Sequence, residues 1–126
     1  MSAVPSVAAV DWGTTRLRVW LLDSNGNVLG ERRGDDGLIS AREKGFAAVL
    51  ENHLTKLGAP PALPVVICGM AGSRQGWVEA PYVDTPAPMT AILEGAVRVA
   101  GTARDIRIVP GLAQRAVGFP DVMRGE

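Results

Sequence analysis

Two short apolar runs open the chain, and the residues between them limit what it can fold into. Residues 7–10 and 17–22 have the composition of β-strands, and they are separated by the polar segment 11–15. In the second run, leucine and valine alternate with arginine and tryptophan, the period-2 pattern of a strand with two unequal faces. The sequence therefore predicts a β-hairpin at the start of the chain.

A third strand and a helix are predicted next. A turn rich in Asp, Ser, Asn and Gly at 23–27 leads into a strand over 28–33, which completes a three-stranded meander. Ser40 and Glu43 have the spacing of a capping box, and the apolar residues that follow lie on one helical face up to Gly58. His53 lies on that face, where we expect a packed histidine rather than a metal ligand.

The second half alternates between apolar runs and segments rich in glycine and proline. The continuous apolar run 65–70 predicts a strand inside the sheet with both faces covered. Residues 69–88 predict a structured loop, and 89–100 and 106–109 predict a helix and a strand. The expected order is β-β-β-α-β-α-β, followed by a weakly patterned tail over 110–126.

Length and charge narrow the class of protein. The chain has 126 residues, 47% of them apolar, and 13 basic side chains balance 13 acidic ones, so we expect one globular domain. Zero net charge argues against the basic field of non-specific nucleic-acid or membrane binders, so neither partner is predicted. No run reaches membrane length, no cationic leader precedes the domain, and Cys68 is the single cysteine. These features predict a cytoplasmic protein with Cys68 as a buried strand residue.

The segment between the first two strands has the strongest chemical content. Gly13 permits a left-handed backbone, so the amides of Gly13, Thr14 and Thr15 can converge on an anion, with both hydroxyls beside them. Asp11 can hold Mg²⁺, a hard ion that favours carboxylate oxygens. A plain hairpin turn with the same residue types is the alternative. Neither a P-loop nor a dinucleotide-binding fingerprint is present.

Five blocks in order carry a family resemblance. The segment 10–15 resembles the first phosphate-binding segment of the actin, hexokinase and heat-shock-protein ATPase superfamily. With the later blocks 69–77, 80–82, 108–112 and 122–126, the chain closely resembles the 2-dehydro-3-deoxygalactonokinase family. Members of that family are more than twice as long, so residues 1–126 are expected to be an N-terminal domain without its second domain.

The resemblance implies a fold and an activity. The expected fold is an α/β, ribonuclease-H-like (actin-like ATPase) domain, in which helices flank a mixed sheet. The expected activity is ATP-dependent phosphorylation of the 6-hydroxyl of 2-dehydro-3-deoxy-D-galactonate in galactonate breakdown, with ATP and Mg²⁺ as cofactors. The C-terminal domain of the same chain is the implied partner that completes the cleft. The 126 residues alone are therefore expected to be inactive. Their exposed interdomain face is expected to cause either self-association, as a homo-oligomer, or instability.

The resemblance also assigns roles to residues. Asp11 would bind the metal and act in catalysis, Gly13, Thr14 and Thr15 would bind the nucleotide, and Glu126 would orient or deprotonate the acceptor hydroxyl. Some of these residues also have a non-functional interpretation. Arg74 can be a solvated surface residue, Trp77 a packing residue, and Arg124 and Glu126 solvated terminal charges. The residues assigned to the sugar acid are Gly69, Met70, Ala71, Gly72, Ser73, Arg74, Trp77 and Arg124.

Three other functions remain open. Another carbohydrate kinase of the superfamily would share the segment 11–15 but not the later blocks. A nuclease of the ribonuclease-H type would need further inward carboxylates for two metals, and zero net charge suits a polyanionic duplex poorly. A non-catalytic sugar-phosphate-binding or regulatory module could keep the turn and lose the chemistry, although the intact Asp11 argues against it.

Overall fold

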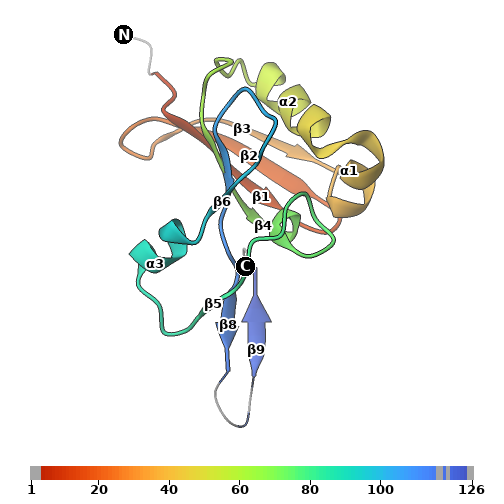
Figure 1. Cartoon of the computed structure of the whole chain (residues 1–126). Coiled ribbons are helices and arrows are strands. Elements are labelled where there is room, and N and C mark those ends of the chain that lie inside the picture. Colours follow the sequence, from red (N-terminus) through yellow and green to blue (C-terminus); the bar gives the residue numbers. More distant parts are fainter. Residues whose placement is uncertain (1–3, 116–117, 119, 125–126) are drawn as a thin grey trace.

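The chain begins with the antiparallel meander that its alternation predicts (Figure 1). The computed structural model describes residues 4–115, 118 and 120–124. Asp23 closes the second turn because its Oδ1 accepts the amides of Asn25 and Asn27, each at 2.9 Å. The three strands are β1 (Val7–Trp12), β2 (Leu17–Leu22) and β3 (Val28–Gly34).

A six-stranded mixed sheet forms the centre of the molecule. Its strand order is β3-β2-β1-β4-β7-β6, and β4 lies parallel to both β1 and β7. The predictions of an α/β fold with a mixed sheet, and of an internal strand that begins at residue 65, are therefore confirmed. The added strands are β4 (Val65–Gly69), β6 (Val97–Arg98) and β7 (Ile106–Ile108).

Two helices occupy the region where one was predicted. Helix α1 (Leu38–Lys44) and helix α2 (Phe46–Lys56) are separated by Gly45, whose φ of 96° interrupts the helical backbone. The predicted capping box is wrong. Gly37 is the N-cap of α1 and provides no side chain, and the Ser40 hydroxyl instead donates to Asp36 Oδ1 at 3.1 Å.

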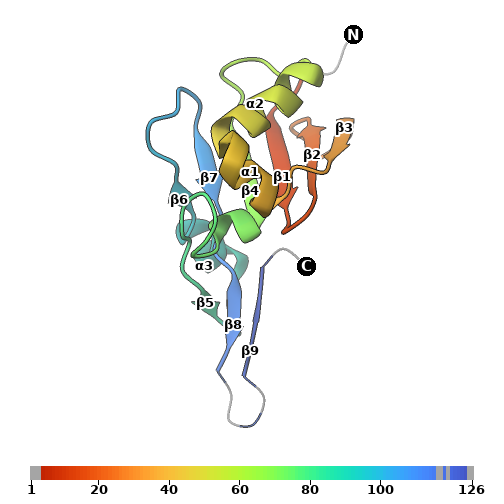
Figure 2. The same ribbon diagram turned by 90° about the vertical axis from the view of Figure 1, so that its right-hand side faces the viewer.

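The helices cover one face of the large sheet, as Figure 2 shows. On that face Val10, Trp12 and Ile67 are at most 2% exposed, and His53 of α2 is 3% exposed, which confirms its packed position. On the other face Val66 is 38% exposed, so the prediction that β4 is covered on both sides is wrong. Successive residues of one strand therefore meet different surroundings.

A second, smaller sheet extends beyond the end of the first (Figures 1 and 2). Its order β5-β8-β9 places two strands in the tail, where no regular element was predicted, because strands of three residues carry almost no periodicity. Helix α3 is shorter than predicted, since the chain leaves it to pair β6 with β7. The elements that lie outside the large sheet in this half of the chain are the short 3-10 helix η1 (Met70–Gly72), β5 (Val83–Asp84), α3 (Met89–Glu94), β8 (Leu112–Gln114) and β9 (Asp121–Met123).

Candidate functional site

Asp11 lies near the carboxyl end of β1, on the face of the sheet that the helices leave open. It is half-buried, and in the strand ladders it lies opposite Arg18 of β2 and Cys68 of β4. Its neighbour Trp12 points into the core and is fully buried. Because β1 and β4 are parallel, their carboxyl ends meet at one sheet edge, where α/β proteins commonly bind ligands.

Gly69, the last residue of β4, makes room for Asp11. Its φ is +102°, and a Cβ there would lie 2.5 Å from the Trp12 carbonyl oxygen and 3.2 Å from Asp11 Oδ1. A side chain at this position would collide with β1 and crowd the carboxylate. The structure thus brings Asp11 together with the start of the predicted substrate segment, which continues into the turn η1.

The turn between β1 and β2 differs in one respect from the predicted anion nest. The Gly13 amide donates to the Arg16 carbonyl at 2.8 Å and closes the hairpin, and Gly13 does not adopt a positive φ. The prediction that this amide joins the nest is therefore wrong. Thr14 and Thr15 are exposed, and within the described part of the chain neither amide donates to the protein. Their amides and hydroxyls are the groups that this turn offers to a ligand.

The segment after Gly69 folds back on itself. The Ser73 hydroxyl and amide donate to the Met70 carbonyl, at 2.7 and 3.0 Å, and Ala71 and Gly72 are buried. Arg74 is exposed. The Ser73 hydroxyl therefore supports its own turn, and the exposed guanidinium at the next position is the group most open to an anion.

Trp77 packs on the helix-covered side of the sheet, away from the face that carries Asp11. Its ring stacks on Phe46 with centroids 5.8 Å apart and meets Trp12 edge-on at 6.2 Å. Trp77 therefore has the packing role that was its alternative to a substrate contact. The structure does not bring its ring together with Asp11.

Arg124 is buried, so the view of it as a solvated terminal charge is wrong. It is 9% exposed, its Nη2 donates to the Ala80 carbonyl at 2.6 Å, and its guanidinium lies 4.3 Å from the centre of the Tyr82 ring. A Cβ on Gly72 would lie 3.0 Å from Arg124 Nη1, so the arginine packs on the predicted substrate segment. Glu126 lies outside the described residues.

Three arginines near the turn were not among the predicted site residues. Arg16, Arg18 and Arg33 line a cavity of about 180 Å³ together with Asp35. Arg18 lies directly opposite Arg33, and Arg33 Nε donates to Glu31 Oε1 at 3.0 Å. The alternation of β2 places Arg18 on the face of Asp11, and this was the signal that could have identified it.

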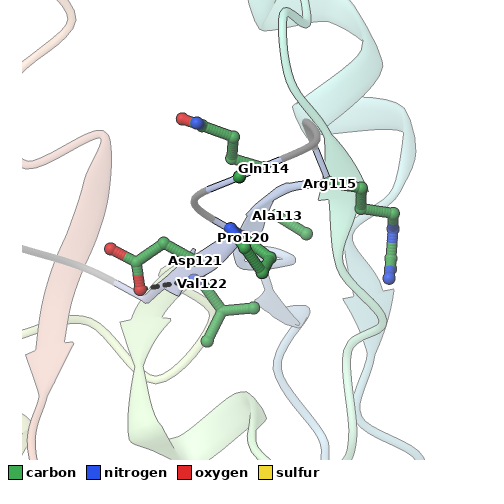
Figure 3. A pocket seen from close by; sticks show the side chains of 7 residues that line it. Ala113, Gln114, Arg115, Pro120, Asp121 and Val122 are labelled. Carbon is green, nitrogen blue, oxygen red and sulfur yellow. Dashed lines mark hydrogen bonds between the residues drawn. The ribbon is translucent and has the colours of Figure 1, made fainter.

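A larger cavity lies elsewhere and shares no lining residue with this site. It measures about 590 Å³ and is formed by the β8–β9 hairpin. Figure 3 shows the hydrogen bond within β9 in which Asp121 Oδ1 accepts the Val122 amide, at 2.8 Å. Arg115 pairs with Asp84 of β5. Its charged groups are therefore engaged within the small sheet.

Asp11 could contribute one carboxylate to a metal whose other ligands are waters and substrate phosphates. Burial, reinforced by the negative charge of Asp11, raises the pKa of the Cys68 thiol to about 11. Among the described residues, no three His, Cys, Asp or Glu side chains gather as a metal cage. Mg²⁺ does not require one, because it is usually held by one or two carboxylates with waters and substrate phosphates. The single carboxylate of Asp11 fits that pattern.

None of the helices in the described part of the chain has the length and apolarity that crossing a membrane requires.

Comparison with known proteins finds matches that extend over most of the chain. A profile of the 2-keto-3-deoxy-galactonokinase family matches residues 11–126. The chain is 50% identical over its whole length to a probable 2-dehydro-3-deoxygalactonokinase of Rhizobium meliloti, strain 1021. It is 37% identical over 118 residues to the 2-dehydro-3-deoxygalactonokinase of Escherichia coli K12.

A solved structure agrees with these matches. The crystal structure of a Sinorhizobium meliloti protein assigned as a 2-dehydro-3-deoxygalactonokinase aligns with 94% of this chain at 51% identity, with a TM-score of 0.87. The chain covers 40% of that structure, and 41% and 39% of the two curated relatives. It therefore spans about two fifths of the length of the proteins it matches.

Proposed function

The chain belongs to the 2-keto-3-deoxy-galactonokinase family, and from this premise we propose that it is the N-terminal domain of a kinase that transfers phosphate from ATP to 2-dehydro-3-deoxy-D-galactonate. The domain is proposed to be ribonuclease-H-like, as in actin-like ATPases. The strand order β3-β2-β1-β4-β7, with β1 parallel to β4, supports that fold. A C-terminal domain of the full-length protein would complete the cleft, because the matched relatives are about two and a half times as long.

One observation carries the proposal, namely the position of Asp11 at the sheet edge between the exposed Thr14–Thr15 turn and Gly69. Phosphoryl transfer requires little covalent chemistry from the protein. It depends on placing donor and acceptor in line and on neutralising charge on the phosphates. The Asp11 carboxylate for the metal, and the Thr14 and Thr15 amides, which donate to no described residue, would supply both needs.

On the nucleotide side, each residue has a distinct task. Asp11 would hold Mg²⁺, which when bound neutralises phosphate charge. The amides and hydroxyls of Thr14 and Thr15 would bind phosphate oxygens, and Gly13 would keep the hairpin tight through its bond to Arg16. Arg18 and Arg33 face each other across the ladder and line a cavity with Arg16, although Glu31 already offsets part of the charge of Arg33. We assign their cavity to the charge of the bound substrates.

On the sugar-acid side, the segment 69–74 would form the floor of the acceptor site. Arg74 is the exposed cation for the carboxylate, since a guanidinium suits bidentate pairing. Trp77 and Arg124 would support this segment, because the Trp77 amide donates to the Ala71 carbonyl at 2.7 Å and Arg124 packs on Gly72. Glu126 would orient or deprotonate the 6-hydroxyl. We further propose that this metabolic kinase works in the cytoplasm and that the isolated domain self-associates.

The test is an assay of ADP release by the full-length protein with a panel of sugar acids. We expect turnover with 2-dehydro-3-deoxygalactonate and a loss of at least about a hundredfold in kcat for Asp11→Asn, because the carboxylate charge that holds the metal is removed. Asp105→Asn is the matched control, since Asp105 lies in exposed ion pairs with Arg98 and Arg107. The 126-residue chain alone should show negligible turnover.

Three results would contradict the proposal or a part of it. Turnover with a different sugar acid alone would indicate another carbohydrate kinase of the superfamily. Binding of sugar acids without turnover, in a protein that also binds MgATP, would indicate a non-catalytic module. Full activity of Asp11→Asn would remove the metal role from Asp11 whatever the substrate.

A further inference from the structure

The Thr14–Thr15 turn rests on the N-cap and the first residues of helix α1. The Leu38 amide donates to the Gly13 carbonyl at 2.9 Å, and the Ile39 amide lies 3.4 Å from the Thr14 carbonyl oxygen. Gly37 packs so closely beneath the turn that a Cβ would lie 2.5 Å from the Thr14 carbonyl oxygen. The position of the turn is therefore set by the position of residues 37–39.

Asp36, the residue before Gly37, holds that segment in place through both backbone and side chain. Its carbonyl oxygen accepts the Trp12 indole Nε1–H at 2.9 Å. Its carboxylate Oδ1 accepts Ser40 Oγ at 3.1 Å and Lys44 Nζ at 2.7 Å, both from α1. These charge-assisted bonds, Lys44 first, lower the pKa of the Asp36 carboxyl, which therefore stays ionised.

His53 connects the same carboxylate to α2 and β3. Its Nδ1 accepts Arg32 Nε at 3.2 Å, so the proton of the neutral imidazole is on Nε2, which lies 3.8 Å from Asp36 Oδ2. Gly34 contacts the ring so closely that a Cβ would lie 2.8 Å from His53 Nε2. The carboxylate of Asp36 thus has α1 on one side and the buried histidine of α2 on the other.

We propose that Asp36 is a positioning residue for nucleotide binding, which acts by fixing the Thr14–Thr15 turn through residues 37–39. The proposal rests on the proposed function, because it assigns the turn to the phosphates of ATP. Asp36 itself need not touch the nucleotide. Sites that bind anions through backbone amides depend on the placement of those amides, so residues supporting them from behind affect binding strongly.

The position of Asp36 predicts an effect on one substrate only. Its contacts lead to Thr14 and Thr15, and none of its hydrogen bonds reaches the segment 69–74 assigned to the sugar acid. A loss of positioning should therefore weaken MgATP and spare the acceptor. A merely structural role would lower the folded fraction, and with it the apparent kcat, and would leave the KM values of both substrates unchanged.

The experiment compares Asp36→Ala, Asp36→Asn and the control Asp105→Asn in the full-length protein. Asparagine keeps an oxygen that accepts from Ser40 and Lys44 but loses the charge, and alanine loses both. We expect the KM for MgATP to rise about tenfold in Asp36→Ala and less in Asp36→Asn. The KM for the sugar acid and kcat should stay within about twofold of wild type. In both variants the bond from Trp12 to the backbone remains available.

Hydrogen exchange of the Gly13 and Leu38 amides provides a readout that does not depend on activity, because these amides donate to the Arg16 and Gly13 carbonyls beside the turn. Faster exchange of these amides in Asp36→Ala, with unchanged exchange in β4, would support the positioning role. This holds even if the wild-type protein shows no kinase turnover, because absent turnover would refute only the proposed function. An unchanged KM for MgATP together with unchanged exchange would overturn the positioning role. So would an equal rise in the KM values of both substrates.

Discussion

The two faces of the six-stranded sheet place neighbouring residues of the same strands in opposite surroundings. Beneath α1 and α2, Trp12 of β1 and Ile67 of β4 are fully buried. One residue away on each strand, Asp11 and Cys68 lie opposite each other on the open face and are half-buried. Because side chains alternate along a strand, one residue contributes to the stability of the core and its neighbour is available for chemistry on the open face.

The alternation along β1 allows this small domain to hold the charged Asp11 beside its core. Asp11 needs no insertion in β1, because the pleat alone turns it away from the apolar layer that contains Trp12. The two faces meet at Gly69, where a Cβ would touch both the Trp12 carbonyl and the Asp11 carboxylate. Substitutions on the covered face should therefore reduce stability, those on the open face should reduce activity, and those at Gly69 should reduce both.

The largest effect on stability is expected from Ile67→Ala on the covered face. Ile67 is fully buried in the core cluster, so the substitution removes buried methyl groups and leaves a cavity. We expect a loss of about 2–5 kcal/mol in the free energy of unfolding, measured by urea denaturation. Cys68→Ala, at the next position of β4, is the control and should cost less than about 1 kcal/mol. Equal losses at the two positions would remove the distinction between the faces.

Gly69→Ala should produce a smaller loss of stability together with a loss of activity. Alanine must adopt a φ of +102° and place its Cβ 2.5 Å from the Trp12 carbonyl oxygen. We expect a cost of about 2 kcal/mol in unfolding free energy and a displaced Asp11 carboxylate. The measurement is kcat at a temperature where the variant remains folded.

Gly58→Ala is a suitable control for Gly69→Ala, because Gly58 also has a positive φ, of +75°, but nothing lies within 4 Å of the Cβ position. It shares the backbone strain without the contact with Asp11. Unchanged kcat in both variants would show that Gly69 is a purely structural glycine.

Much of the fold follows from local pattern, and the differences have identifiable causes. The alternation of β2 and the turn at Asp23 predicted the meander, which the structure confirms. The capping box failed because Ser40 has a stronger partner in Asp36, a contact that no local spacing reveals. The strands of the tail escaped prediction because β8 and β9 exist through pairing with each other and with β5.

The sequence predicted which residues contribute to the site, but not the contacts that position them. Residue types alone suggested Asp11, Thr14 and Thr15, and the strand register places Asp11 beside Gly69. That the Gly13 amide closes the hairpin, and that Trp77 packs on Phe46, depends on contacts between segments far apart in the sequence. Asp36 was missed for the same reason, since its importance comes from α1, α2 and Trp12 together.

The dependence of stability on pH should report on His53, which is buried on the covered face of the sheet. Burial, aided by the charge of Arg32, lowers the pKa of His53 below its ordinary value of 6.5. The unfolded chain therefore binds a proton before the folded one, and stability should fall as the pH drops below about 6.5. The pKa of Asp36 is also lowered, so its contribution is retained until the pH falls below its ordinary value of 3.8.

Urea denaturation between pH 8 and pH 5 measures this effect, which should be smaller than that of Ile67→Ala. The chain contains a single histidine, so His53→Gln should remove most of the pH dependence in that window. Glutamine also retains an oxygen that can accept from Arg32. If the slope persists in His53→Gln, a different group causes it.

The smallest effect is expected at Cys68, where the thiol reports on the charge of Asp11. Burial and the Asp11 carboxylate raise the pKa of Cys68 to about 11, so at pH 8 the thiol should react with iodoacetamide about a hundredfold more slowly than a thiol at its ordinary value of 9.0. Asp11→Asn removes the second cause but leaves burial, so alkylation should accelerate only severalfold. A cation bound at Asp11 offsets the same charge, so Mg²⁺ with a nucleotide should accelerate the wild-type reaction and leave the variant unchanged. Alkylation rates that respond equally to Mg²⁺ in both proteins would place the metal away from Asp11, and the open face would then lose its main chemical distinction from the covered one.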